Sequence, residues 1–239
     1  TLLIASVLGL TATAFYARIP EIRGEESARQ AEGGFAQGLK VFARDRGFIL
    51  FCVINFIWTL GIQVSGPFFS VYMVEDLGFG VDTVALLATV STIFSALAVR
   101  VAGTLIDRHG AQRVTMIGML LVPLMPVAWI FAHTPLEVGA AKVYGVLAWA
   151  GVNVAAMPLI LQISPARYRS QYIAIFNTVN GIAAVLGPLP AAWLYANYGF
   201  RTNLALSAAG RGLGALLFLV ASLRGLFHLA EERPAQTVI

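Results

Sequence analysis

Charged residues and glycines gather in the stretch RVAGTLIDRHGAQRV, residues 100–114, although the rest of the chain is strongly apolar. A carboxylate at Asp107 suits pairing with an arginine or a helix N-terminus, and Arg108 and Arg113 suit acidic groups or lipid phosphates. Gly110 can adopt a positive φ and turn the chain sharply. Gly103 leaves room for a neighbouring helix to approach closely. The pattern therefore predicts a charged contact at a sharp turn between two helices.

A second group of polar and aromatic side chains lies within long apolar runs. Polar groups at membrane depth are costly against lipid and usually face a protein interior. Asn55, Trp58 and Thr59 are spaced by three and four residues, which places them close to one helical face. The candidates for a substrate cavity are Asn55, Trp58, Thr59, Trp149, Asn153 and Asn177. Alternatively, the amides and hydroxyls hold helices together and the tryptophans anchor at the membrane interface.

The sequence lacks the residues needed for proton transfer by a buried acid, for metal binding and for phosphate binding. All 12 Asp and Glu side chains lie outside the apolar runs or at their ends, so no buried acid is evident for carrying a proton. The 3 histidines show no metal-ligand spacing, and the chain has no phosphate-binding G-x4-GK[ST] loop. We therefore predict no catalytic residues, no metal and no cofactor.

Composition indicates the elements that must position these residues. The chain has 239 residues, of which 58% are hydrophobic and 12% charged, and its mean hydropathy is +0.78. Soluble domains carry about 25% charged residues, so we predict an all-α, polytopic membrane helix bundle. The net charge of +4 forms no dense basic stripe, which argues against nucleic acid as a partner. We expect the lipid bilayer to surround the helix bundle.

Apolar runs long enough to cross a bilayer, which takes about 20 residues, divide the chain. One partial and six full spans are predicted at 1–16, 48–74, 82–105, 114–133, 136–163, 168–197 and 200–226. The predicted division is thus the end of a membrane helix (1–16), a cytoplasmic linker (17–47), a six-helix bundle (48–226) and a cytoplasmic tail (227–239).

The distribution of basic residues predicts the orientation. If 17–47 is cytoplasmic, 11 of the 16 Lys and Arg residues fall on the cytoplasmic side and only Lys142 and Arg201 on the outer side. The other three, Arg100, Arg211 and Arg224, fall within the spans. This bias agrees with the positive-inside rule and places the C-terminus in the cytoplasm.

Two Gly-Pro pairs and one arginine stand out inside the spans. Gly66-Pro67 and Gly187-Pro188 can bend their helices, although Gly and Pro are also common in membrane helices generally. Arg211 lies near the middle of the last span. A charge there is expensive, and we expect it to snorkel or to reach an interior partner in a structural role.

The stretch from Gly103 to Arg113 resembles the loop signature of the major facilitator superfamily of secondary transporters, G-x3-D-R/K-x-G followed by basic residues. Members have twelve helices in two six-helix halves, with this signature in each half. The resemblance implies that the chain is the C-terminal half: the end of helix six, the central loop, and helices seven to twelve. The missing N-terminal half would be its partner, and Asp107 would brace a helix of that half.

The resemblance also implies a function. We expect the C-terminal half of a secondary active transporter in the plasma (inner) membrane, not an enzyme, moving a small-molecule substrate by alternating access. A proton or ion is the expected coupling partner. The lack of a buried acid favours a neutral or anionic solute. The alternatives are a seven-span receptor or sensor, and a membrane enzyme, which would need clustered His, Asp or Glu at the membrane surface.

Overall fold

The structure is a computed structural model, and it describes residues 11, 13, 39 and 41–227. Residues 39–239 form one compact unit, separate from residues 1–38. The statements below concern the described part of this larger unit. Most of the predicted helix end 1–16, most of the predicted linker 17–47 and nearly all of the predicted tail 227–239 lie outside the described residues.

Six membrane-length helical stretches make up the described unit, and its residues form no β-strand. The all-α polytopic membrane bundle predicted from composition is therefore confirmed. Several stretches are interrupted, so the helices outnumber the spans. In chain order the elements are α4 (Arg46–Ser65), η1 (Gly66–Phe68), α5 (Phe69–Glu75), α6 (Val81–His109), α7 (Ala111–Leu121), α8 (Leu124–Phe131), α9 (Pro135–Ile163), η2 (Ala166–Tyr168), α10 (Arg169–Leu186), α11 (Pro188–Tyr198) and α12 (Phe200–Leu223).

Side-chain caps and glycines set the ends of several helices. The Asp45 carboxylate accepts a hydrogen bond from the backbone N–H of Phe48 and caps α4. Thr134 and Glu137 form a reciprocal capping box at the start of α9. Gly110 joins α6 to α7 with a φ of +82°, a conformation that glycine adopts without strain.

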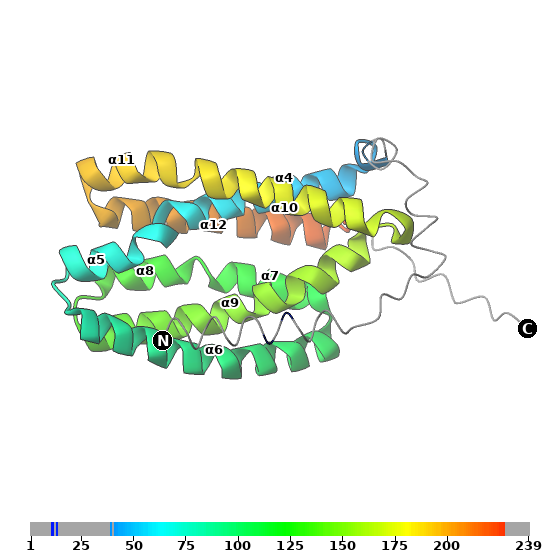
Figure 1. Ribbon diagram of the computed structural model, residues 1–239. Helices are drawn as coiled ribbons and strands as arrows, with labels where there is room; N and C mark the ends of the chain where they lie inside the picture. Colours follow the sequence, from blue (N-terminus) through cyan, green and yellow to red (C-terminus); the bar gives the residue numbers. More distant parts are fainter. Residues whose placement is uncertain (1–10, 12, 14–38, 40, 228–239) are drawn as a thin grey trace, which may run out of the picture. The chain divides into compact units, whose positions relative to one another are not determined.

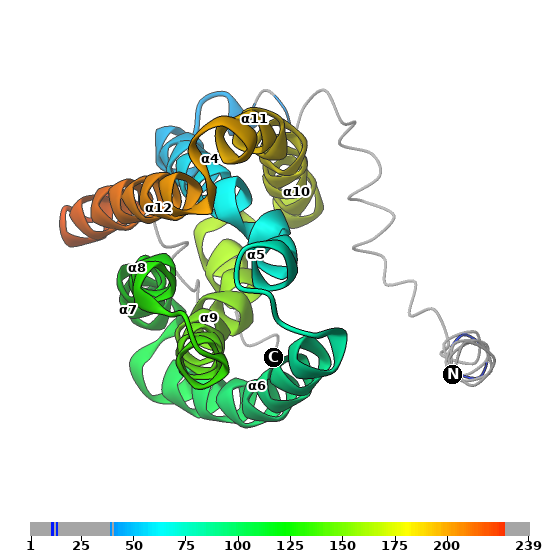
Figure 2. The same cartoon turned by 90° about the vertical axis from the view of Figure 1, so that its left-hand side faces the viewer.

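The spans pack into a bundle with α9 inside it. Figure 2 shows the bundle along its helices, with α6, α10, α11 and α12 at the periphery. The closest packing joins α12 to α4, and α9 packs on both α6 and α7. Figure 1 shows the same helices running side by side along their length.

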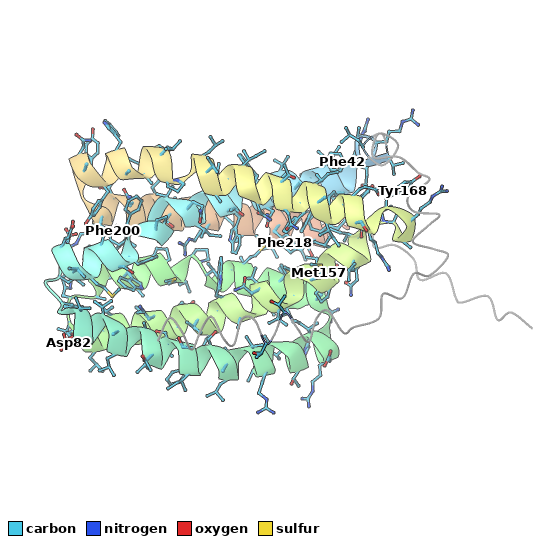
Figure 3. The ribbon with its side chains drawn as sticks, in the orientation of Figure 1. Phe42, Asp82, Met157, Tyr168, Phe200 and Phe218 are labelled. Atoms are coloured by element: carbon cyan, nitrogen blue, oxygen red, sulfur yellow. The ribbon has the colours of Figure 1, made fainter. Side chains whose placement is uncertain are left out.

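The two ends of the bundle differ in charge. We call the end that holds Asp45 and the α6–α7 turn the linker end, and the opposite end the distal end. Figure 3 shows Phe42 and Tyr168 at the linker end and Asp82 and Phe200 at the distal end. Arginines gather at the linker end: Arg44, Arg46, Arg108, Arg113, Arg167, Arg169 and Arg224. The distal end carries the acidic residues Glu75, Asp76, Asp82 and Glu137.

Burial is uneven among the spans. Within the most apolar 18-residue window of each, 39% of the residues are buried in four spans, but only 11% in α6 and 17% in the span from η2 to α11. These two spans therefore present most of their apolar surface to something outside the described unit.

Candidate functional site

The charged loop lies at the linker end, in the turn between α6 and α7. The side chains of Asp107, Arg108 and Arg113 are exposed there, and none of them forms a hydrogen bond or ion pair with another described residue. Gly103 faces open space, because a Cβ built on it would meet no atom within 4 Å. The motif thus offers one carboxylate and two guanidinium groups at the exposed end of the least buried span.

The polar candidates on α4 are held by α10. The Asn180 side-chain oxygen accepts hydrogen bonds from Asn55 Nδ2 at 2.5 Å and from Thr59 Oγ1 at 3.0 Å. All three residues are partly buried. This small network joins α4 to α10 at membrane depth, and it leaves the amide nitrogen of Asn180 as a further donor.

The aromatic candidates meet between α4 and α9. Trp58 is buried, and its ring stacks on that of Trp149 with centroids 5.1 Å apart and an interplanar angle of 16°. Asn153 lies one helical turn beyond Trp149, and Asn177 lies on α10. Both of these asparagines are exposed in the described unit, and their side chains form no hydrogen bond with another described residue.

Both Gly-Pro pairs coincide with interruptions of a helix. Gly66 and Pro67 form the short 3-10 turn between α4 and α5. Gly187 ends α10, and Pro188 begins α11. A Cβ at Gly187 would overlap the side chain of Gln63, so the glycine permits a close approach of α4. The interruption at Gly187 therefore lies where α10 touches α4.

Arg211 points into the bundle, where only 3% of its surface is exposed. Its Nη2 donates to Ser65 Oγ at 3.0 Å and lies 3.4 Å from the carbonyl oxygen of Ile62. Its Nη1 contacts the sulfur of Met125 at 3.9 Å, and its Nε has no partner in the described unit. No described carboxylate forms an ion pair with this guanidinium.

Arg211 belongs to a polar stripe along α12. Asn203 and Ser207 precede it at four-residue steps, and both are fully buried. Ser207 Oγ donates to the carbonyl oxygen of Gly61 at 2.5 Å and accepts from Ser65 Oγ at 2.9 Å. The stripe thus faces the last turns of α4, just before that helix is interrupted.

A cavity of about 240 Å³ adjoins Arg211. Its walls come from α4, η1, α5, α6, α8, α9 and α12. Lys142 and Trp149 line it together with Arg211, and no carboxylate is among its lining residues. The cavity therefore combines two cationic side chains with an aromatic wall.

The described residues hold no cluster of His, Cys, Asp and Glu that could bind a metal ion. A comparison with protein families matches residues 52–237 to the Major Facilitator Superfamily. The chain belongs to this superfamily. Members of the superfamily span the membrane with apolar helices, and the six membrane-length stretches agree with that assignment. The chain is therefore an integral membrane chain of this superfamily.

Two of the relatives that the chain resembles have names of different kinds. The chain is 31% identical over 188 residues to a Na(+), Li(+), K(+)/H(+) antiporter of Planococcus maritimus. The matched region covers 75% of the chain and 43% of that relative. It is 28% identical over 171 residues to the multidrug resistance protein MdtG of Klebsiella pneumoniae (strain 342), covering 68% of the chain and 40% of the relative. The chain thus spans about two fifths of the length of these relatives.

Several residues of the site are not evident from the sequence. Ser65, Asn203 and Ser207 were not singled out, because serine and asparagine in a membrane helix are not unusual on their own. Asn203, Ser207 and Arg211 stand at i, i+4 and i+8, which places three polar side chains on one face of α12. That spacing could have indicated Asn203 and Ser207, whereas no pattern in the sequence indicates Ser65. Lys142, predicted to lie toward the outer side, is in the first part of α9.

Proposed function

We propose that the chain is the C-terminal half of a secondary active transporter that moves a small solute by alternating access. Its site would lie between this bundle and a second bundle elsewhere in the same protein. Membership of the superfamily supports the class of activity, and transporters of this kind rock two halves about a central site.

The observation that carries the proposal is the charged turn between α6 and α7. Asp107, Arg108 and Arg113 are exposed at the end of α6 and bind nothing in the described unit. The α6 span is also the least buried, at 11%. A carboxylate and two guanidinium groups at the end of an uncovered apolar face suit a contact with another set of helices.

The orientation and coupling follow from charge and from the relatives. We infer that the linker end faces the cytoplasm, since arginines gather there, and that the membrane is the plasma membrane. One relative is named an antiporter of Na(+), Li(+) or K(+) against H(+), which supports coupling to a proton or another ion. The second relative's name supports a small organic solute.

The test is transport by membrane vesicles that contain the intact protein. Four fluxes are measured: Na⁺ and K⁺ by the pH change each causes, ethidium by fluorescence, and benzoate by radiolabel. We expect protein-dependent flux of at least one solute and a loss of about tenfold in Asp107→Asn. Hydrogen bonds to charged groups are worth about 1.5–3 kcal/mol, and about 1.4 kcal/mol off a barrier corresponds to tenfold in rate.

The matched control is Asp82→Asn at the distal end of the same helix, which should transport like the unaltered protein. Protein amounts in the vesicles are equalised before rates are compared. The proposal fails if no solute moves faster than in empty vesicles. It also fails if Asp107→Asn transports as fast as Asp82→Asn.

A further inference from the structure

Arg211 is a buried cation without a described counter-charge. Its exposed fraction is 3%, and its contacts are a serine hydroxyl, a backbone carbonyl and a thioether sulfur. A charged group removed from water is costly unless an opposite charge or a full set of hydrogen bonds compensates it. The Nε atom has no acceptor among the described residues. The guanidinium therefore carries a positive charge that no described group neutralises, beside the cavity that Arg211 lines.

A second cation lines the same cavity. Lys142 is half-buried in α9, and it forms no hydrogen bond or ion pair with another described residue. Two uncompensated cations on one cavity raise the local potential, and the low dielectric of the bundle strengthens their effect. The cavity therefore favours negative charge and disfavours a metal cation or an ammonium group.

The size and walls of the cavity favour an organic anion over an inorganic one. Its volume of about 240 Å³ is several times the roughly 30 Å³ that one water molecule occupies in the liquid. Ile62, Phe69 and Trp149 form apolar and aromatic parts of the wall. Such a wall buries an apolar body, while a few polar groups fix its orientation.

We propose that this cavity binds a small organic monoanion, with its carboxylate at Arg211 and Lys142 and its apolar body against Trp149. The planar guanidinium matches a carboxylate in shape and donor geometry. Trp149 is fixed by its stack on Trp58, so the aromatic wall is formed before the ligand arrives. This inference rests on the proposed function, because it names the class of solute that the transporter recognises in this half.

Equilibrium dialysis with radiolabelled benzoate tests the proposal on the intact purified protein. Benzoate should bind saturably, and benzamide, which has nearly the same shape without the charge, should compete about tenfold less well. A charge-assisted hydrogen bond is about twice as strong as a neutral one, and tenfold corresponds to about 1.4 kcal/mol. Chloride is added as a separate competitor at the concentration of benzoate.

The variants separate the charge in the cavity from charge elsewhere in the membrane. Arg211→Gln should abolish binding, and Lys142→Gln should weaken it about tenfold, because each removes one cation from the cavity. Lys142→Arg should retain binding. Arg100→Gln removes an exposed arginine of α6 that does not line the cavity, and it should bind like the unaltered protein.

The decisive variant is Lys142→Gln. Arg211→Gln removes hydrogen bonds within the bundle and can unfold it, whereas Lys142 has no described partner to lose. The proposal is overturned if benzoate does not bind, if Lys142→Gln leaves benzoate binding unchanged, or if equimolar chloride displaces benzoate.

Binding is measured without transport, so its outcome is separate from that of the proposed function. Ethidium or Na⁺ flux without benzoate binding would leave the proposed function standing and overturn only the anion site. Benzoate binding without flux of any solute would leave the anion site standing and overturn the proposed function.

Discussion

At the residue scale, the contact between α4 and α12 depends on glycines. A Cβ on Gly61 would lie 2.6 Å from the backbone nitrogen of Arg211 and 2.8 Å from the carbonyl carbon of Gly210. A Cβ on Gly214 would lie 2.6 Å from the Cβ of Trp58. Small residues at helix contacts let backbones approach closely in membranes. Here the approach also brings Arg211 within reach of Ser65.

Gly61→Ala should therefore destabilise the bundle. The added methyl group meets backbone atoms, which cannot move aside without shifting a whole helix, and overpacking of this kind costs about 1–3 kcal/mol. Cys52 is buried and is the only cysteine of the chain. Its reaction with a fluorogenic thiol reagent during heating measures unfolding, with any other cysteine of the intact protein replaced by serine.

The control for this prediction is Gly212→Ala. Gly212 lies on α12 between Gly210 and Gly214, which both contact α4, but a Cβ at Gly212 would meet nothing within 4 Å. Alanine has a higher helix propensity than glycine by about 1 kcal/mol. Gly212→Ala should leave the unfolding temperature unchanged or raise it. Equal unfolding temperatures for Gly61→Ala and the unaltered protein would show that the α4–α12 contact is looser than described.

At the element scale, each interrupted span obtains a hydrogen bond from a neighbouring helix. Proline lacks an N–H, so a carbonyl one turn earlier loses its partner. Gln63 Nε2 donates to the carbonyl oxygen of Ala184, four residues before Pro188, at 3.3 Å. Asn203 Nδ2 donates to the carbonyl oxygen of Val64, beside the interruption between α4 and α5, at 3.1 Å.

The interruption between α7 and α8 follows the same pattern. The hydroxyl of Tyr144 on α9 donates to the carbonyl oxygen of Leu121, the last residue of α7, at 2.8 Å. Interruptions in membrane helices are tolerated where neighbouring side chains satisfy the freed backbone groups. The three interrupted spans are thus tied to their neighbours at the points where they depart from a continuous helix.

Tyr144→Phe should lower the stability of the bundle by about 1 kcal/mol. The change removes only the hydroxyl and leaves the carbonyl of Leu121 without that donor; interhelical hydrogen bonds in membranes are worth about 0.6 kcal/mol on average and up to about 1.7. The same thiol-reactivity measurement applies.

Tyr198→Phe is the matched substitution for comparison. Tyr198 is exposed at the end of α11, and its described contact is between its ring and that of Trp193, which phenylalanine can keep. It should unfold at the temperature of the unaltered protein. If Tyr144→Phe also does so, the hydroxyl contributes nothing to holding the α7–α8 interruption.

At the scale of the whole molecule, the sequence was sufficient to predict the spans. Each predicted full span corresponds to one membrane-length stretch, with boundaries that agree within a few residues. The reason is physical, because a bilayer imposes both a minimum length and an apolar composition on each helix. The glycine turn at Gly110 could also be predicted, since its position follows from local backbone geometry.

The sequence did not predict which helix faces meet. Ser65 and Ser207 form a hydrogen bond across 142 residues of chain, and Asn55 reaches Asn180 across 125. Periodicity places such residues on a face of one helix but does not say which helix covers that face. The interior position of Arg211 was one of two outcomes left open, and its cavity with Lys142 needed the packing of several helices to appear.

The central claim, that a site between this bundle and a second bundle opens to each side of the membrane in turn, can be tested at Asn153. This residue is exposed one helical turn beyond Trp149, near the middle of α9. Asn153→Cys is introduced into the intact protein after its own cysteines, Cys52 included, are replaced by serine. As a control, Asn197→Cys near the distal end of α11 should react from the distal side alone.

The measurement is the labelling of Asn153→Cys by a membrane-impermeant maleimide applied to one face of the membrane at a time. Alternating access predicts labelling from both faces, because the site opens to each in turn. Addition of a transported solute should slow both reactions. Labelling of Asn153→Cys from one face only, or from neither, would contradict the account.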